Sequence, residues 1–274
     1  MYIDAHFHTN VYNRYENALV QALAILNELK ILIVSSSTDP DSYQQTLEIA
    51  VKSKYVLPCF GIHPQVAHEY LDKLDALNDL FDQAIAFGEI GLDHYYLKDE
   101  SQYPAQYTLL EHFFSKARDQ DKLVVLHLDG AEEQGYEMIK KFSLTKVIVH
   151  GYKGSLETMR KLLGIGCYFS VGGNMILDAF KQEMTEDDWI LFQSIIKEIP
   201  SNRLLVETDG PCRMEPTPPE GAPRSMPSYI FEMITKIASV REISSEQLQE
   251  STNNNFKQLI QNDEFLKSYS SLIV

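Results

Sequence analysis

The chain has 274 residues, of which 44% are hydrophobic and 23% are charged, and its formal net charge is −15. A chain of this length and composition can bury a large core, and the negative charge argues against a protein that binds nucleic acid through a broad basic face. The charge does not exclude an enzyme whose bound metal ions contact a phosphate locally, because a divalent cation can be the largest charge in its site.

Neither a membrane segment nor a disulfide framework is predicted. No apolar run is long enough to span a bilayer, and no basic-then-apolar leader precedes the first predicted strand. The three cysteines are odd in number and far apart, so they indicate neither paired disulfides nor a cysteine-based zinc site. We therefore expect a cytoplasmic monomer with no membrane partner and with a single domain over residues 1–274.

Short apolar runs alternate with amphipathic helical patterns along the chain. In the first half, strands are predicted at Tyr2 to Ala5, Ile31 to Val34, Val56 to Phe60 and Ala84 to Phe87, and helices at Asn17 to Lys30, Pro40 to Lys52, Leu71 to Phe81 and Pro104 to Asp121. In the second half, strands are predicted at Leu123 to Leu126, Lys146 to Val149, Gly166 to Val171 and Leu204 to Val206, and helices at Glu132 to Lys141, Ser155 to Leu163, Asp178 to Ile199, Ser228 to Val240 and Ser244 to Gln261. Eight strands with helices between them predict an α/β fold, the (β/α)8 TIM barrel.

Residue types that bind metal ions follow these apolar runs. His6 and His8 come directly after the first strand, and their side chains point the same way because strand side chains repeat every two residues. Later runs end in residues of the same kind, which are His63, Glu89, His127, His150 and Asp209. In a barrel the carboxyl ends of the strands converge on one face, where the catalytic groups of this fold lie. Because buried histidines and carboxylates need partners, the pattern predicts a pair of divalent ions at the mouth of the barrel.

Five short segments carry most of these residues. They are Asp4-Ala-His-Phe-His8, Gly61-Ile-His-Pro64, Gly88-Glu-Ile-Gly-Leu-Asp93, His150-Gly-Tyr-Lys-Gly154 and Glu207-Thr-Asp-Gly-Pro211. In this order and spacing they resemble the TatD-like metal-dependent deoxyribonucleases, and the resemblance extends from residue 2 to about residue 255. It implies an amidohydrolase-like barrel with two metal ions, one held by His6, His8 and Asp209 and the other by His127 and His150, with Glu89 bridging them.

The roles of three of these residues have alternatives. Asp209 is the candidate general base, and its alternative role is that of a ligand only. Glu89 is the candidate bridge between the metals, and its alternative is a structural salt bridge. His63 is a candidate contact to the scissile phosphate, and its alternative is to cap the loop before Pro64. Imidazole and carboxylate ligands suit Zn²⁺ or Mn²⁺ and, with water, Mg²⁺, so the ligand types leave the identity of the metals open.

The chain departs from the family pattern at the expected substrate contacts. Family members commonly carry an arginine two residues after the histidine of the fifth strand, whereas this chain has Asp129 there. Lys153, in the altered sixth-strand segment, is a candidate replacement for the missing positive charge. Arg224 matches the position of a family arginine and Arg213 lies nearby in sequence; for both, the alternative is a solvated loop charge.

Two tyrosines and three histidines lie outside the predicted ligand set. Tyr95 and Tyr96 follow the Glu89 segment, and they are candidates either for stacking on unpaired bases or for ordinary packing. His68, His94 and His112 lie in loop or helix patterns and are expected to pack or to face solvent.

Three functions of different classes are compatible with the sequence. The leading one is a two-metal phosphodiesterase that acts on DNA from the 3′ end, because a barrel mouth admits a strand terminus more easily than the middle of a duplex. The second is a metal-dependent hydrolase of another ester or amide, which the missing arginine favours. The third is a non-catalytic partner in a larger assembly, against which the complete set of ligand residues argues.

Overall fold

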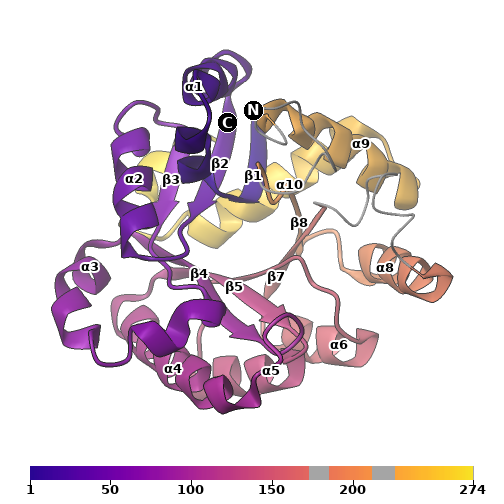
Figure 1. Ribbon diagram of the computed structural model, residues 1–274. Coiled ribbons are helices and arrows are strands. Elements are labelled where there is room, and N and C mark those ends of the chain that lie inside the picture. Colours follow the sequence, from indigo (N-terminus) through magenta and orange to yellow (C-terminus); the bar gives the residue numbers. More distant parts are fainter. Residues whose placement is uncertain (173–184, 212–225, 274) are drawn as a thin grey trace.

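A computed structural model describes residues 1–172, 185–211 and 226–273. The strands of these described residues lie inside a ring of helices (Figure 1). The strands are β1 Tyr2–Phe7, β2 Ile31–Ser36, β3 Val56–Cys59, β4 Ala86–Asp93, β5 Leu123–Asp129, β6 Val147–His150, β7 Tyr168–Gly172 and β8 Leu204–Glu207. The α-helices are α1 Ala18–Leu29, α2 Pro40–Ala50, α3 Asn78–Gln83, α4 Tyr103–Gln120, α5 Glu132–Phe142, α6 Leu156–Gly164, α8 Glu186–Glu198, α9 Ile230–Val240, α10 Ser245–Ile260 and α11 Lys267–Ser270. None of these helices is both long and apolar enough to cross a membrane.

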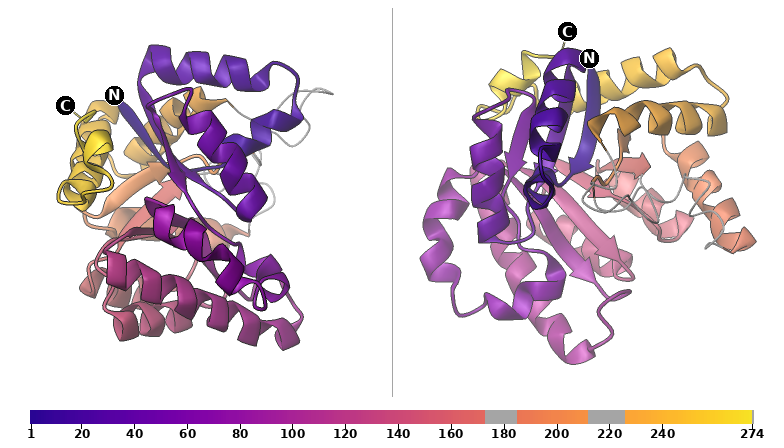
Figure 2. Two further views of the ribbon diagram at one scale, coloured as in Figure 1. Left: turned by 90° about the vertical axis from the view of Figure 1, so that its left-hand side faces the viewer. Right: turned by 45° about the horizontal axis from the view of Figure 1, so that its top comes forward.

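The strands are parallel and pair in chain order. One group runs β1-β2-β3 and the other runs from β4 to β8. Parallel bridges close both seams between the groups, one joining Phe60 to Phe87 and the other joining Phe7 to Gly210. The result is the (β/α)8 barrel that the sequence predicts, seen from two further directions in Figure 2.

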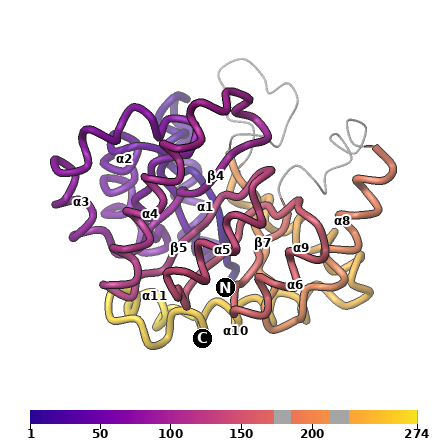
Figure 3. Tube along the Cα trace, turned by 90° about the horizontal axis from the view of Figure 1, so that it is seen from below, coloured from indigo at the N-terminus to yellow at the C-terminus, as the bar shows by residue number. Residues whose placement is uncertain are grey.

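Two hydrophobic clusters hold the barrel together. The larger lies between the strands and the surrounding helices. The smaller takes at least one side chain from each of the eight strands, for example Ile3, Leu57 and Leu205, together with Phe256 and Ile260 of α10. The same cluster includes Leu266 and Ile273, so the C-terminal segment closes the amino end of the barrel, as the view from below shows (Figure 3). This plug leaves the opposite end, where the strands finish, for a site.

Side-chain caps account for several helix starts. The carboxylate of Asp39 accepts a hydrogen bond of 2.7 Å from the backbone N–H of Ser42, and Pro40 occupies the first turn of α2. Ser155 caps α6, accepting from the N–H of Thr158 at 3.1 Å. These caps end the βα loops at fixed points, which limits how far the loops around the barrel mouth can move.

The fourth strand is the main difference from the predicted elements. It runs over Ala86–Asp93, well beyond the predicted end at Phe87, so Glu89 lies inside the strand and not after it. Glycines made this segment look like a loop, but Gly91 has φ of 152° and a Cβ there would overlap the carbonyl oxygen of His127. The close approach of β5 therefore requires glycine at this position of the strand.

Other differences concern helices. The helix predicted at Leu71 to Phe81 is instead a 3-10 helix at Leu74–Leu77 followed by α3. The 3-10 helices Thr9–Arg14 and Pro64–Glu69 and the short α11 were not predicted. Of the helix predicted at Asp178 to Ile199, the described part is α8, and residues 178–184 lie outside the described residues, as does Cys212.

Candidate metal centre

The six predicted metal ligands meet at the carboxyl end of the barrel. β1 supplies His6 and the residue after it supplies His8, while Glu89, His127 and His150 come from β4, β5 and β6, and Asp209 follows β8. A cavity of about 360 Å³ opens over them. Both β1 and β4 have a register irregularity at their ligand residues, between Asp4 and Phe7 and between Phe87 and Ile90. Such irregularities re-aim side chains, and here they occur where ligands must turn into the mouth.

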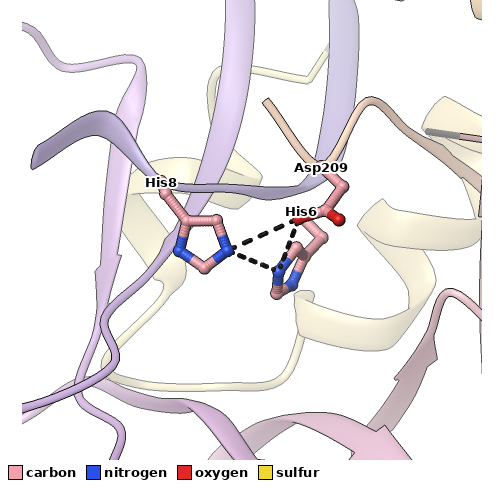
Figure 4. A group of neighbouring side chains, drawn as sticks. All are labelled: His6, His8 and Asp209. Carbon is pink, nitrogen blue, oxygen red and sulfur yellow. Dashed lines mark hydrogen bonds and ion pairs between the residues drawn. The ribbon is translucent and has the colours of Figure 1, made fainter. Parts of the chain in front are cut away.

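One half of the cluster contains His6, His8 and Asp209 (Figure 4). The Nε2 atoms of the two histidines lie 3.1 Å apart. Asp209 Oδ1 lies 3.6 Å from His6 Nε2 and 3.5 Å from His8 Nε2. The three donor atoms therefore converge on one point, as the His-x-His spacing predicts.

The other half contains His127 and His150, and Glu89 joins the two halves. Glu89 Oε1 lies 2.9 Å from His127 Nδ1 and 2.9 Å from His150 Nε2, and these two nitrogens are 3.2 Å apart. Glu89 Oε2 lies 3.6 Å from His6 Nε2 and 3.5 Å from His8 Nε2. Each oxygen of Glu89 thus faces a different half, which is the arrangement expected of a bridging carboxylate.

Oxygen atoms lie behind three of the histidines, on the side away from the cluster. His8 Nδ1 lies 3.0 Å from the carbonyl oxygen of Ser36, and because a carbonyl only accepts, this nitrogen carries a proton and Nε2 is the atom that faces the cluster. Glu207 Oε1 lies 3.6 Å from His150 Nδ1, and Asp93 Oδ2 lies 3.6 Å from His127 Nε2. A carboxylate behind a histidine is a common outer partner of metal ligands.

Sequence reasoning missed this outer set of Ser36, Asp93 and Glu207. Asp93 and Glu207 could have been predicted from the sequence, because they lie in the same short segments as the predicted ligands Glu89 and Asp209. Ser36 contributes a backbone carbonyl to His8, which any residue type would supply, and a hydroxyl that lies 3.3 Å from His6 Nδ1; it follows a predicted strand that carries no ligand residue.

The donor atoms fit metal ions. Ligands held at about 2.0–2.2 Å from an ion in a tetrahedral or octahedral shell are separated from one another by about 2.8–3.6 Å. The separations within the cluster, from 2.9 to 3.6 Å, fall in this range. The Nε2 atoms of His6 and His8, 3.1 Å apart, are close enough to share either a proton or a cation, so a metal ion can take the place of the proton between them.

The charges of the cluster also favour cations. Burial raises the pKa of Glu89, but the positive charges of His63, His150 and His6 outweigh it and hold the pKa well below its usual range. Burial lowers the pKa of His127, but its carboxylate neighbours Asp93 and Glu89 raise it to about 9. In the absence of metal, protons on the histidines balance the carboxylates, and metal ions would replace those protons.

His63 caps the segment that begins at Pro64, which is one of the two roles considered for it, and it also lies beside the predicted ligands. Its Nδ1 accepts from the N–H of Gln65 at 3.3 Å and so caps the 3-10 helix Pro64–Glu69. Its Nε2 lies 3.5 Å from Glu89 Oε1, beside the ligands and on the cavity wall. As expected, the other histidines pack or face solvent: His68 is exposed and His94 stacks on Tyr103 with ring centroids 3.7 Å apart.

The candidate substrate contacts are arranged differently from expectation. Lys153 lines the cavity, but its Nζ lies 2.9 Å from Asp129 Oδ2, so its charge is paired with the residue it was expected to compensate. Tyr96 lines the cavity, whereas Tyr95 is exposed and lies outside the lining. Arg213 and Arg224 lie outside the described residues.

Comparisons with known proteins identify the family of the chain. The family model described as "TatD related DNase" matches residues 3–261. The uncharacterized metal-dependent hydrolase YabD of Bacillus subtilis is 26% identical over 265 residues, a match that covers 94% of this chain and 98% of the relative. The human 3'-5' RNA nuclease TATDN2 is 30% identical over 219 residues, which cover 77% of this chain and 27% of the human protein.

Solved structures show the same fold. The crystal structure of YJJV, a TATD homolog from Escherichia coli k12, superposes with a TM-score of 0.79 at 23% identity and covers 94% of this chain and 97% of its own. A TatD family hydrolase from Entamoeba histolytica superposes with a TM-score of 0.76 at 20% identity, covering 94% of this chain and 97% of its own.

Proposed function

Because the chain belongs to the TatD related DNase family of metal-dependent hydrolases, we propose that it is a two-metal phosphodiesterase that removes nucleotides from the 3′ end of single-stranded nucleic acid. The observation that carries the proposal is Glu89, whose two oxygens face two separate groups of ligand nitrogens. His6, His8 and Asp209 would hold one ion, and His127 and His150 the other. When bound, two such ions supply a nucleophile at neutral pH and stabilise the charge on both the attacking and the leaving oxygen of a phosphodiester.

Asp209 is the residue proposed to accept the proton of the attacking water. Burial raises the pKa of Asp209, but hydrogen bonding to His8 and the charge of His6 outweigh it and keep the pKa below its usual range. The carboxylate is therefore ionised at neutral pH, and it lies on the cavity wall where a substrate can reach it. Its role as a ligand and its role as a base are compatible, because a carboxylate has several lone pairs.

The backbone around Asp209 is held in one conformation. Asp209 has φ of 52°, in the left-handed region, which only a few residue types adopt readily. Its N–H donates to the carbonyl oxygen of His6 at 3.1 Å. The preceding residue, Thr208, donates its N–H and its hydroxyl to the carboxyl group of Asp4 at 3.0 and 2.5 Å. These contacts fix the direction of the Asp209 side chain relative to His6 and His8.

The cavity supports action at a chain end. At about 360 Å³ it accommodates about one nucleotide and not a duplex. His63 stands beside Glu89 on the wall, where it can donate to a phosphate oxygen. The direction of attack is supported by the human relative TATDN2, which is named a 3'-5' RNA nuclease, while the family is described as DNases. We include both polymers in the proposal.

The acidic wall of the cavity favours a second candidate, a metal-dependent hydrolase of a less charged ester or amide. Among the described residues, Asp39, Asp129 and Glu207 line the cavity in addition to the carboxylate ligands, and Lys153 is their cationic counterpart. A substrate with a single phosphate or none would meet less repulsion there.

A labelled single-stranded oligonucleotide tests the proposal. With Mn²⁺, Mg²⁺ or Zn²⁺ added, the 3′ label should be released at once as a mononucleotide, while a 5′ label should give a ladder of shortening products. A chelator should stop both, as should His127→Ala, whereas His68→Ala, an exposed histidine outside the cluster, should have no effect. Cleavage of lactone or amide substrates without any cleavage of oligonucleotides would reject the phosphodiesterase and favour the second candidate.

A further inference from the structure

The charged pair formed by Asp129 and Lys153 sits at a defined place in the cavity wall. The other carboxylates of the wall outside the ligand set are engaged by the protein: Asp39 caps α2, and Glu207 stands behind His150 and accepts from the hydroxyl of Ser170. Asp129 is instead bound to a side chain of the wall itself, since its Oδ2 lies 2.9 Å from Lys153 Nζ.

The position of Asp129 is fixed on all sides. It ends β5, and its backbone carbonyl accepts from the N–H groups of His94 at 2.7 Å and Tyr95 at 3.1 Å. Only 5% of its surface is exposed, whereas the Lys153 side chain is 35% exposed. The Asp129 carboxylate therefore cannot swing away from the cavity in the way that a surface side chain can.

Asp129 lies one step beyond a predicted metal ligand. His127 and Asp129 are two residues apart on the same strand, so their side chains leave the same face and are separated by about 7 Å along β5. A phosphodiester bound beside His127 would place its neighbouring sugar, the next unit of the chain, near Asp129. The ring of Tyr96, which also lines the cavity, lies 5.5 Å from Lys153 Nζ at the same level.

A carboxylate in this place has a clear chemical preference. It repels a second phosphate, but it accepts hydrogen bonds from hydroxyl groups, and an ionised carboxylate has about four acceptor positions. The sugar of RNA offers a 2′-hydroxyl and the sugar of DNA does not, which is how proteins distinguish the two polymers at a given nucleotide. A carboxylate oriented by an ammonium group is thus suited to recognise ribose.

We propose that Asp129, oriented by Lys153, accepts a hydrogen bond from the 2′-hydroxyl of the nucleotide next to the cleaved bond, and that the site therefore prefers RNA ends over DNA ends. This inference rests on the proposed phosphodiesterase function and specifies its substrate. Asp129 acts here as a specificity-determining residue and takes no part in proton transfer.

The test compares single-stranded oligonucleotides of one sequence with the manganese-loaded protein. One oligonucleotide is all-deoxy, two carry a single ribonucleotide at the last or the next-to-last position of the 3′ end, and one is all-ribo. The wild-type protein should cleave one of the singly substituted oligonucleotides with a kcat/KM about tenfold or more above that of the all-deoxy one, the scale expected for a hydrogen bond to a charged group.

Variants assign the preference to Asp129. In Asp129→Ala, kcat/KM for the ribonucleotide-containing oligonucleotide divided by kcat/KM for the all-deoxy one should be close to one. Metal content should be unchanged, because the Lys153 side chain is 35% exposed and its charge can be hydrated once Asp129 is removed. Lys153→Ala should lower the ratio as well, since it removes the ammonium group that orients the carboxylate oxygens at the cavity wall. Asp129→Arg, which restores the family residue type, should favour the all-deoxy oligonucleotide. Glu100→Ala removes an exposed carboxylate outside the cavity lining and should leave the ratio unchanged.

Failure of the ribose preference can be distinguished from failure of the phosphodiesterase function. Equal cleavage of all oligonucleotides by the wild-type protein would overturn the inference and leave the phosphodiesterase standing, and so would a ribose preference that survives in Asp129→Ala. Absence of cleavage of every oligonucleotide would overturn both.

Discussion

At the scale of single residues, the site depends most on Glu89. Its carboxylate is in contact distance of His6, His8, His127 and His150, and it is 4% exposed. A buried carboxylate without partners would be costly, but here it is surrounded by groups that are positively charged or metal-binding. This residue therefore sets the charge balance for both halves of the cluster.

Glu89→Gln keeps the shape of the side chain and removes its charge. We expect metal occupancy to fall and kcat to drop more than the about 10- to 100-fold that is usual for a change in an outer partner. Glu207→Gln, which alters only the carboxylate behind His150, provides that milder comparison. Metal content and steady-state rates measure the effect, and far-ultraviolet circular dichroism checks the fold. Equal losses in the two variants would argue against a bridging role.

Asp4 gives a second prediction at this scale. Burial raises its pKa from 3.8 to about 8, despite the hydrogen bonds from Thr208. Between these two pH values the folded chain retains a proton that the unfolded chain releases, so this group stabilises the fold at low pH, and the contribution is lost as the pH rises through about 8.

Asp4→Asn stays neutral at every pH and can keep both contacts to Thr208. The free energy of unfolding of the variant minus that of the wild type should therefore increase as the pH rises from 4 to 8, by at most about 1.4 kcal/mol per pH unit. Urea titrations at several pH values, with a chelator present, measure this difference. Parallel pH profiles for the two proteins would show that Asp4 is ionised throughout.

The sequence indicated the ligands better than the substrate contacts. Ligands such as His127 and His150 are fixed by strand ends, and strand ends are visible as the limits of apolar runs. Which of Tyr95 and Tyr96 lines the cavity depends on the path of a loop, and the pairing of Lys153 with Asp129 joins the loop after β6 to the end of β5, 24 residues away in the chain. Neither relation is encoded in a local pattern.

At the scale of elements, the seam between β3 and β4 positions the bridging residue. Phe60 and Phe87 pair across it, and Gly61 packs directly against the backbone of Gly88 and Glu89 in β4. A Cβ on Gly61 would overlap backbone atoms of Gly88 and Glu89, so glycine is required for the close approach of the two strands.

Gly61→Ala should displace β4 at the bridging carboxylate. We expect a loss of about 1–3 kcal/mol in the free energy of unfolding without metal, together with weaker metal binding. Gly164→Ala is the matched control, because a Cβ at this exposed helix position has nothing within 4 Å, and alanine there should be neutral or stabilising by up to about 1 kcal/mol. Chemical denaturation and metal titration of the two variants provide the comparison, and similar behaviour would show that the seam adjusts without moving the site.

Elements were predicted well where hydrophobic periodicity is strong, as in α4 and α10, and badly where glycine has a packing role. The strand β4 was cut short because Gly88 and Gly91 resemble loop residues, although each meets a neighbouring strand. Contacts between strands distant in sequence decide such positions, and a single sequence does not display them.

At the scale of the whole molecule, the ligand set joins the two groups of strands. β1 belongs to the first group, while Glu89, His127 and His150 belong to the second, and Asp209 follows β8 across the other seam. Metal ions bound to all of them would tie the barrel together at its mouth, opposite the plug formed by α10 and the C-terminal segment.

The folded protein should therefore be stabilised by metal. At a free concentration about 100 times the dissociation constant, each ion should add about 2.7 kcal/mol to the free energy of unfolding, provided that the unfolded chain does not bind it. Thermal unfolding with Zn²⁺ or Mn²⁺ against a chelator should show a higher Tm with metal. His6→Ala should lose most of this increase in Tm, and His68→Ala should lose none of it. If the Tm of the wild type is the same with metal as with chelator, the ions do not bind the folded site.

We propose that this barrel mouth holds two divalent ions, and the metal content of the purified protein shows whether it does. After loading with Zn²⁺ or Mn²⁺ and removal of free metal, elemental analysis should find two ions per chain in the wild type and fewer in Glu89→Gln. A wild-type protein that retains no stoichiometric metal would contradict the two-ion site, and a Glu89→Gln variant that retains the full two ions would contradict the bridging role of Glu89.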